Sequence, residues 1–319
     1  MRFLNVLFLI CLHYSLSAQQ TAEKFIQETR YLLYLPDGYD KDTSVKWPMV
    51  MFLHGSGESG ADVQKVKVHG PPKLVEQGKK FPFILVSPQS DFGSGWNVDQ
   101  LYLLLLDLKK NKRVDDKRIY LTGLSMGGFG TWALAIKHPE EFAAIAPVCG
   151  GGDTSNSWKL RYMPIWNFHG AKDDVVPPSG SNNMINSIRR YNNNIRYTLY
   201  PDANHNSWDA TYNNDSVYIW LLAQKKFHYE NKNVAHGILN QYEGWFVGPD
   251  KDTVQILLEN NALVARPGNQ TIPLMAAGNN LFFLHPDKLM DIQFIKTQNK
   301  VNGFLFMGDR KLMYRKIKQ

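Results

Sequence analysis

The sequence predicts an α/β protein: a mostly parallel, doubly wound sheet, followed by a small C-terminal antiparallel β domain. Two observations lead to this fold class. Short apolar runs alternate with helical patterns as far as residue 226, an order typical of a parallel sheet with helices on both faces. From residue 242 onward, short alternating segments are separated by turn residues, which is typical of antiparallel strands.

Seven apolar runs are expected to form the strands of the sheet. Residues 48–53 illustrate the pattern, because every position is apolar and the run stops at His54-Gly55. A run that is apolar on both faces suits a buried parallel strand. Ligands bind beyond the carboxyl ends of such strands, so the residues after each run are the candidates for chemistry. The expected strands cover 31–35, 48–53, 83–86, 119–122, 142–148, 165–168 and 195–200.

Helical patterns lie between most of these runs. Asn97 is placed to cap the first of them, and the second carries apolar residues at helical spacing on one face. The expected helices cover 98–110, 126–137, 179–191 and 215–226. In the C-terminal region the expected strands cover 254–258, 263–266, 281–284, 292–296 and 303–307.

The chain is predicted to divide into four parts. Residues 1–18 combine a positive start, an apolar run and small residues at the end, which is typical of a secretory signal peptide; a buried N-terminal helix is the alternative. An α/β domain over 19–229, a linker over 230–241 and a small β domain over 242–319 follow. Ile10 before Cys11 disfavours a lipoprotein anchor. The protein is therefore expected to be secreted or periplasmic.

Composition excludes several other classes of protein. The net charge of +7 is spread along the chain without a run of five basic residues, so nucleic-acid binding is not expected. No stretch approaches the ~20 apolar residues of a membrane span. After removal of the signal peptide only Cys149 is left, which rules out an internal disulfide and a cysteine-based zinc site. Neither a metal nor an organic cofactor is implied.

The segment Gly123-Leu124-Ser125-Met126-Gly127 matches the G-x-S-x-G nucleophile elbow. Its context supports the match, because it follows an apolar strand and opens an amphipathic helix. A tight turn needs small residues on both sides of the serine, and the two glycines provide them. Ser125 at a helix N-terminus would also benefit from the positive end of the helix dipole. Ser125 is therefore the candidate nucleophile.

A serine hydroxyl needs a base, and the base needs an acid to orient it. His205 follows the run 195–200 and precedes a helical pattern, so it is the best-placed histidine after Ser125. The acid is expected after the run 165–168, where Asp173 is favoured and Asp174 is the alternative. The order serine, acid, histidine agrees with the elbow motif.

Acyl transfer also needs donors for the negative charge that develops on the carbonyl oxygen. The backbone N–H of Met126, directly after the candidate nucleophile, is one expected donor. The glycine-rich loop that follows residues 48–53 offers the second, assigned to Ser56 with Gly57 as the alternative. Trp96 and Trp208 lie near the expected active edge and could stack on a substrate or simply pack the loops.

Three segments together resemble the phospholipase/carboxylesterase group of α/β hydrolases, a group similar to feruloyl and acetyl-xylan esterases and to polyhydroxybutyrate-depolymerase-like proteins. They are residues 52–58, 123–132 and 169–177, and the resemblance covers roughly residues 28–226. It implies the α/β-hydrolase fold, a triad of Ser125, Asp173 and His205, and oxyanion donors at Ser56 and Met126. The β domain resembles, more weakly, a domain appended to some exported serine hydrolases.

The expected function is a serine esterase that forms an acyl-enzyme and acts on an acylated carbohydrate or a small acyl ester. A peptidase of the prolyl-oligopeptidase type is the first alternative, although the sequence before residue 31 leaves no room for its gating domain. The second alternative is an inactive hydrolase scaffold that uses the β domain for binding. Small-molecule or glycan esters are the expected partners.

Overall fold

The computed structural model describes residues 28–91 and 95–317, and the predicted signal peptide lies outside the described residues. A seven-stranded sheet forms the first part, with strand order β1-β3-β2-β4-β5-β6-β7. β1 pairs antiparallel with β3, and the other neighbours are parallel. The strands are β1 (Tyr31–Tyr34), β2 (Trp47–Leu53), β3 (Ile84–Pro88), β4 (Val114–Leu124), β5 (Ala144–Val148), β6 (Ile165–Gly170) and β7 (Ile195–Tyr200).

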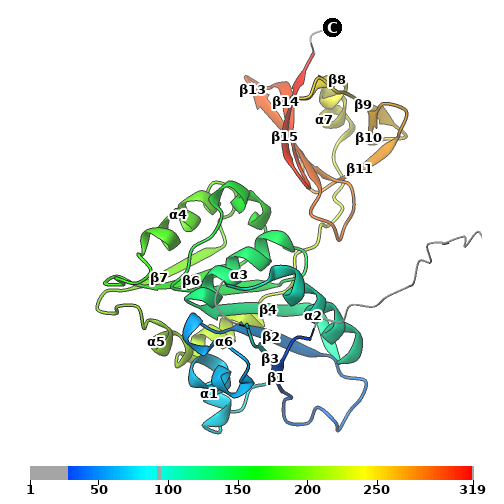
Figure 1. The fold of residues 1–319 in the computed structure, drawn as a ribbon. Coiled ribbons are helices and arrows are strands. Elements are labelled where there is room, and N and C mark those ends of the chain that lie inside the picture. The colour runs from blue at the N-terminus through cyan, green and yellow to red at the C-terminus, as the bar shows by residue number, and fades with distance from the viewer. Residues whose placement is uncertain (1–27, 92–94, 318–319) are drawn as a thin grey trace, which may run out of the picture.

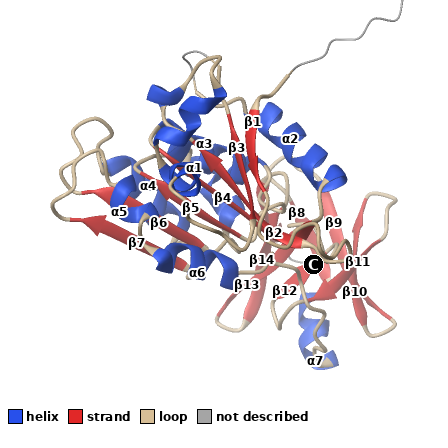
Figure 2. Cartoon of the chain, turned by 90° about the horizontal axis from the view of Figure 1, so that it is seen from below, coloured by secondary structure: helices blue, strands red, loops and turns tan. Residues whose placement is uncertain are grey.

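Helices cover both faces of the sheet (Figures 1 and 2), and each face has its own apolar core. One core joins α2 (Val98–Asn111), α3 (Met126–Lys137) and α4 (Ser179–Ile188) to the strands, with Trp132 fully buried. The other joins α1 (Gly70–Glu76), α5 (Trp208–Tyr212) and α6 (Asp215–Ala223), with Tyr212 and Phe52 in edge contact. The predicted doubly wound α/β fold is confirmed.

The C-terminal part is a closed barrel of eight antiparallel strands. Alternate residues point inward, so Phe246, Phe294, Phe304 and Tyr314 meet in an aromatic interior. The strands are β8 (Gly244–Val247), β9 (Thr253–Glu259), β10 (Ala262–Pro267), β11 (Ile272–Ala276), β12 (Leu281–Phe283), β13 (Asp291–Thr297), β14 (Lys300–Met307) and β15 (Lys311–Lys316). An antiparallel β domain was predicted; its closure, and strands β8, β11 and β15, were not.

The segment predicted as a linker, 230–241, is not a bare connector. It contains α7 (His236–Leu239), and Leu239 is buried in the apolar interior of the barrel. The backbone N–H of Lys232 also donates to the Ala276 carbonyl on the barrel. Much of this segment therefore packs with the barrel, and the domain limits drawn from the sequence stay a prediction.

A buried ion pair joins the barrel to the α/β part. Asp291 at the start of β13 is fully buried, and its Oδ2 accepts from Arg161 at 2.8 and 3.0 Å. The hydroxyls of Tyr162 and Tyr229 donate to the same oxygen. Burial raises the pKa of Tyr162 to about 12, so this phenol stays protonated and remains a donor. Arg161 also donates to the Met307 carbonyl, which fixes one end of β14 against the α/β part.

Asp291→Ala is expected to lower the free energy of unfolding by about 3–5 kcal/mol, because it leaves the Arg161 guanidinium buried without its carboxylate partner. Asp250→Ala is the matched control: Asp250 is 65% exposed and pairs with Arg310 at 3.5 Å, so its loss is expected to cost under about 1 kcal/mol. Urea unfolding of the two variants measures the difference. Equal losses would contradict this account of the junction.

None of the helices described in residues 28–91 and 95–317 is long and apolar enough to cross a membrane.

Candidate active site

The strand-to-helix turn at Ser125 has a strained backbone. Ser125 lies between β4 and α3 with φ at 52°, a value that residues with a side chain rarely adopt. The turn is possible because its neighbours lack a Cβ: one at Gly127 would lie 1.9 Å from the Leu53 carbonyl oxygen, and one at Gly123 would lie 2.4 Å from the Gly127 carbonyl oxygen. The close packing of three backbone segments therefore presents the Ser125 side chain at the carboxyl edge of the sheet.

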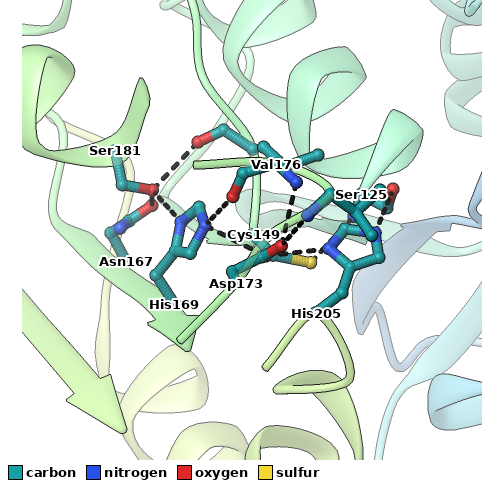
Figure 3. A network of polar contacts seen from close by, with 10 residues as sticks. Ser125, Cys149, Asn167, His169, Asp173, Val176, Ser181 and His205 are labelled. Carbon is teal, nitrogen blue, oxygen red and sulfur yellow. Dashed lines mark hydrogen bonds and ion pairs between the residues drawn. The ribbon is translucent and has the colours of Figure 1, made fainter. Parts of the chain in front are cut away.

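Three side chains from separate loops meet at this edge (Figure 3). His205 Nε2 lies 3.0 Å from Ser125 Oγ, and His205 Nδ1 lies 2.8 Å from Asp173 Oδ2. A carboxylate oxygen only accepts, so Nδ1 carries the hydrogen and Nε2 is left to accept from the serine hydroxyl. Asp174 is exposed and lies outside this chain of hydrogen bonds. The arrangement can make the serine nucleophilic and move its proton to the imidazole.

Both oxygens of the Asp173 carboxylate are in contact with polar groups of the protein. Its Oδ1 accepts from the backbone N–H groups of Val175 and Val176, at 3.0 and 2.8 Å. His169 Nε2 lies 3.2 Å from Oδ2 and 2.8 Å from the Val176 carbonyl oxygen, while its Nδ1 contacts Ser181 Oγ at 2.7 Å. The carboxylate side chain has no exposed surface. Its orientation toward His205 is therefore fixed before any substrate binds.

Two loops are locked together to bring Asp173 and His205 into contact. Ala171 N–H donates to the Tyr200 carbonyl at 2.8 Å, and Lys172 N–H donates to the Ala203 carbonyl at 3.0 Å. Gly170 is needed at this point, because a Cβ there would lie 2.1 Å from the Asn204 carbonyl oxygen. These contacts explain how residues 32 positions apart form one hydrogen bond.

The two expected oxyanion donors each open a helical turn beside Ser125. Met126 is the first residue of α3, and Ser56 is the first residue of the short 3₁₀ helix Ser56–Glu58. The first N–H groups of a helix have no partner within it, so both are available to a ligand. The buried Glu58 carboxylate accepts from Gly55 N–H at 2.9 Å and stabilises the loop. Gly57, the alternative donor, follows Ser56 in the same turn.

His54 fixes the base of this loop. It is fully buried, contacts the Gly55 carbonyl oxygen through Nδ1 at 2.6 Å and accepts from Ser90 N–H through Nε2 at 3.0 Å. Burial lowers the pKa of His54, which keeps the imidazole neutral and able to accept. Trp96 packs over the same histidine at a ring distance of 4.8 Å, and its indole N–H points at the His54 carbonyl oxygen, 3.3 Å away. The contacts of Trp96 are those of a residue that packs the loops.

Trp208 lies beside the candidate base. Its ring is perpendicular to that of His205 at a centroid distance of 5.2 Å, and it also lies 5.3 Å from the ring of His69. His69 Nε2 in turn lies 3.8 Å from the Glu58 carboxylate, in the loop of the expected oxyanion donors. His69 was not predicted from the sequence, because it precedes Ser125 and so falls outside the order serine, acid, histidine. The packing of α1 against α5 brings His69 to the site, and no local motif signals that contact.

Cys149, which follows β5, adds a thiol to this network. Its Sγ accepts from Ser125 N–H at 3.3 Å, and burial raises the pKa of the thiol to about 12. Ligand atoms of Cys149, Asp173 and His205 lie within 4.8 Å of one another, close enough for a metal ion. A metal would need the thiolate and would break the 2.8 Å bond between His205 and Asp173. The described contacts therefore fit a neutral hydrogen-bonding thiol better than a metal ligand.

A parallel sheet with a strained serine elbow and a Ser-His-Asp hydrogen-bonded chain defines the class of α/β hydrolases. Comparison with known proteins agrees. Residues 93–235 match the model of the dienelactone hydrolase family. A crystal structure of a thermostable esterase superposes with a TM-score of 0.54 at 31% identity, covering 62% of this chain and 59% of that one. The chain has the α/β-hydrolase fold, as the sequence predicts.

Several curated relatives are named as esterases. A bifunctional acetylxylan esterase/xylanase from Neocallimastix patriciarum is 27% identical over 180 residues, which are 54% of this chain and 26% of that protein. A probable feruloyl esterase C from Aspergillus terreus is 26% identical over 176 residues, 52% of this chain and 63% of that protein. Poly(3-hydroxyalkanoate) depolymerase C from Paucimonas lemoignei is 24% identical over 193 residues, 45% of each. The chain thus spans less than two thirds of these relatives.

The raised pKa of Cys149 gives a reactivity prediction. A thiol with a pKa of about 12 is deprotonated in roughly one molecule in 10⁴ at pH 8, and only the thiolate reacts readily. Iodoacetamide at pH 8 is therefore expected to leave Cys149 unlabelled in the folded protein and to label it in 8 M urea. Peptide mass spectrometry measures both states. Rapid labelling of the folded protein would contradict the buried, neutral thiol.

Proposed function

We propose that the chain is a serine hydrolase of carboxylic esters that works through an acyl-enzyme. The observation that carries the proposal is the 3.0 Å contact between His205 Nε2 and Ser125 Oγ, with His205 Nδ1 bound to the buried Asp173. A geometry of this kind lets a neutral imidazole accept the hydroxyl proton while the carboxylate stabilises the imidazolium that forms. The esterase names of its relatives agree with this chemistry.

The steps follow from the positions of the groups. Ser125 Oγ attacks the ester carbonyl carbon as its proton moves to His205 Nε2. The carbonyl oxygen becomes negative and accepts hydrogen bonds from the backbone N–H groups of Met126 and Ser56, since each residue is the first of a helical turn. His205 then gives its proton to the alcohol oxygen of the ester. The alcohol departs, and the acyl group stays on Ser125. Water, deprotonated by the same histidine, hydrolyses the acyl-enzyme and regenerates the serine.

The proposed substrates are acylated carbohydrates or small acyl esters. Two relatives are named for acetylxylan and feruloyl ester hydrolysis, which supports sugar-linked acyl groups as the class to test first. Phe129 and Val175 are 44% and 66% exposed and follow Ser125 and Asp173 closely in the chain. Trp208, in contact with His205, is the third apolar side chain available to an acyl group. For Trp96 the loop-packing contacts favour a structural role.

Peptidase activity is the competing function, because the same triad can cleave amides. The present proposal is that ester hydrolysis dominates. The ratio of kcat/KM for p-nitrophenyl acetate to that for a succinyl-Gly-Pro p-nitroanilide discriminates the two, and a preference for the anilide would favour the peptidase. A binding protein built on an inactive scaffold is excluded by any hydrolysis that depends on Ser125.

We also propose that the protein is exported and acts in the periplasm or outside the cell. The sequence pattern over residues 1–18 supports this location. Sequencing the N-terminus of the mature protein tests it: a start at Gln19 agrees with the proposal, and retention of Met1 in a cytoplasmic fraction contradicts it.

The role of Ser125 predicts the effect of Ser125→Ala. Removal of the hydroxyl is expected to lower kcat for p-nitrophenyl acetate and methyl ferulate by at least about 10⁴-fold while the fold is retained, because the proposed nucleophile is lost. The serine is half-buried at the start of α3, so the change removes little packing. Steady-state kinetics, with circular dichroism as the control for folding, measure the effect. A loss of less than tenfold would rule out Ser125 as nucleophile.

The acid is tested by a matched pair of neighbouring aspartates. Asp173→Asn is expected to lower kcat by about 10⁴-fold, because an amide no longer stabilises the His205 imidazolium or fixes its tautomer. Asp174→Asn removes the same charge from an exposed position one residue away and is expected to change kcat by less than about threefold. Equal losses in the two variants, or a larger loss in the second, would transfer the role of acid to Asp174.

A further inference from the structure

The barrel lies away from the candidate active site. It is joined to the α/β part through Arg161, just before β6, and through the turn before β13. The chain leaves the α/β part where Lys226 N–H donates to the Lys117 carbonyl, near the start of β4. Ser125 follows the other end of that strand. The barrel is therefore attached at the amino edge of the sheet, and Ser125 lies at the carboxyl edge. Figure 1 shows the barrel as a separate body beside the α/β part.

One face of the barrel carries all of its exposed large apolar side chains among the described residues. Trp245, Ile295, Met313 and Ile317 are between 36% and 41% exposed. They come from β13, from β15 and the residue after it, and from β8, which lie together because β13 pairs with β14, β14 with β15, and β15 with β8. Ile317 N–H donates to the Trp245 carbonyl at 2.8 Å, so these two side chains are neighbours. Trp245, Ile295 and Met313 point outward, because residues that alternate with them fill the interior.

The same face is hollowed. A groove of about 640 Å³ runs over the start of β14, the end of β15 and the start of β8. Val301, Met313 and Ile317 give it apolar walls. Gly303 pairs with Arg315, and the position does not accommodate a side chain, because a Cβ there would lie 2.2 Å from the Tyr314 carbonyl oxygen. The volume lies within the ~300–1,000 Å³ of ligand clefts.

Cations line this groove. Lys300, Arg315 and Lys316 contribute positive charge, against the single carboxylate of Glu243, which already accepts from Leu258 N–H. The other barrel arginines, Arg266 and Arg310, each pair with a carboxylate. Neither Arg315 nor Lys300 has a side-chain ion pair or hydrogen bond within residues 28–91 and 95–317. The groove thus holds two charged donors that a bound anion could satisfy.

We propose that this face of the barrel binds a polysaccharide whose sugars carry carboxylate groups. An arginine fork matches a carboxylate through two parallel hydrogen bonds, and a flat indole offers a stacking surface to the apolar face of a sugar ring. A second copy of the chain fits poorly, because two cationic grooves would repel each other. A membrane surface also fits poorly, since the site is a groove rather than a protruding apolar ridge. A polysaccharide bound to this face would keep the candidate active site close to the ester groups that the polysaccharide carries.

Binding can be separated from catalysis by using the full chain with Ser125→Ala as the host. In affinity electrophoresis with polygalacturonic acid or glucuronoxylan in the gel, this protein is expected to be retarded, and amylose is expected to have no effect. Arg315→Gln and Trp245→Ala are each expected to weaken the retardation at least tenfold. Arg310→Gln is the matched control: it removes the same charge from the same barrel, near the opposite end of β15, and is expected to leave binding unchanged.

Four results would overturn the proposal. Two concern the polymers: no retardation by either acidic polymer, or a loss of retardation in Arg310→Gln equal to that in Arg315→Gln. The other two concern other occupants of the face: binding to anionic phosphatidylglycerol vesicles that Trp245→Ala abolishes, or a dimer in light scattering that Trp245→Ala dissociates. Melting temperatures within a few degrees of the host confirm that the variants fold. The proposed esterase activity is measured separately, in chains that keep Ser125, on p-nitrophenyl acetate. Failure of one proposal therefore leaves the other standing.

Discussion

The close approach of three backbone segments around Ser125 is the constraint on which the rest of the site depends. β4 turns into α3 within a single residue, and the Leu53 carbonyl at the end of β2 occupies the space where a side chain at Gly127 would lie. Ser125 can keep a left-handed φ because β2, β4 and β5 are fixed between two apolar cores, one on each face of the sheet. The stability of the sheet therefore maintains the strain that aims the hydroxyl at His205.

The polar groups of the site are arranged around this fixed point. Asp173 is bound by two backbone N–H groups and lies beside His169, so protein groups stabilise its charge while Oδ2 faces His205. Two backbone hydrogen bonds between the Asp173 and His205 loops keep the imidazole within reach of Ser125. Such preorganisation matters because groups that need not reorient during the reaction lower its barrier most. The buried Cys149 thiol completes the surroundings of the serine N–H.

Much of this could be predicted from the sequence, because local patterns encode it. Runs such as 48–53 are apolar at every position, and the glycines around Ser125 mark the elbow, so the sheet and the three triad candidates were expected. What the sequence did not reveal depends on contacts between distant elements. His69 reaches the site only through the packing of α1 on α5, and Asp291 meets Arg161 across 130 positions. Short, half-exposed strands such as β8 and β15 have weak patterns, so barrel closure could not be read from them.

Ser125, activated by His205 and Asp173, is proposed to carry the acyl group during turnover. Rapid quench of the wild-type chain with p-nitrophenyl acetate, followed by peptide mass spectrometry, identifies the acylated residue. The expected result is an acetyl adduct on the peptide that contains Ser125, formed in a burst of p-nitrophenol that equals the enzyme concentration when deacylation is slow. An adduct on Cys149 instead, or hydrolysis that leaves Ser125 unmodified even under conditions that slow deacylation, would contradict the account.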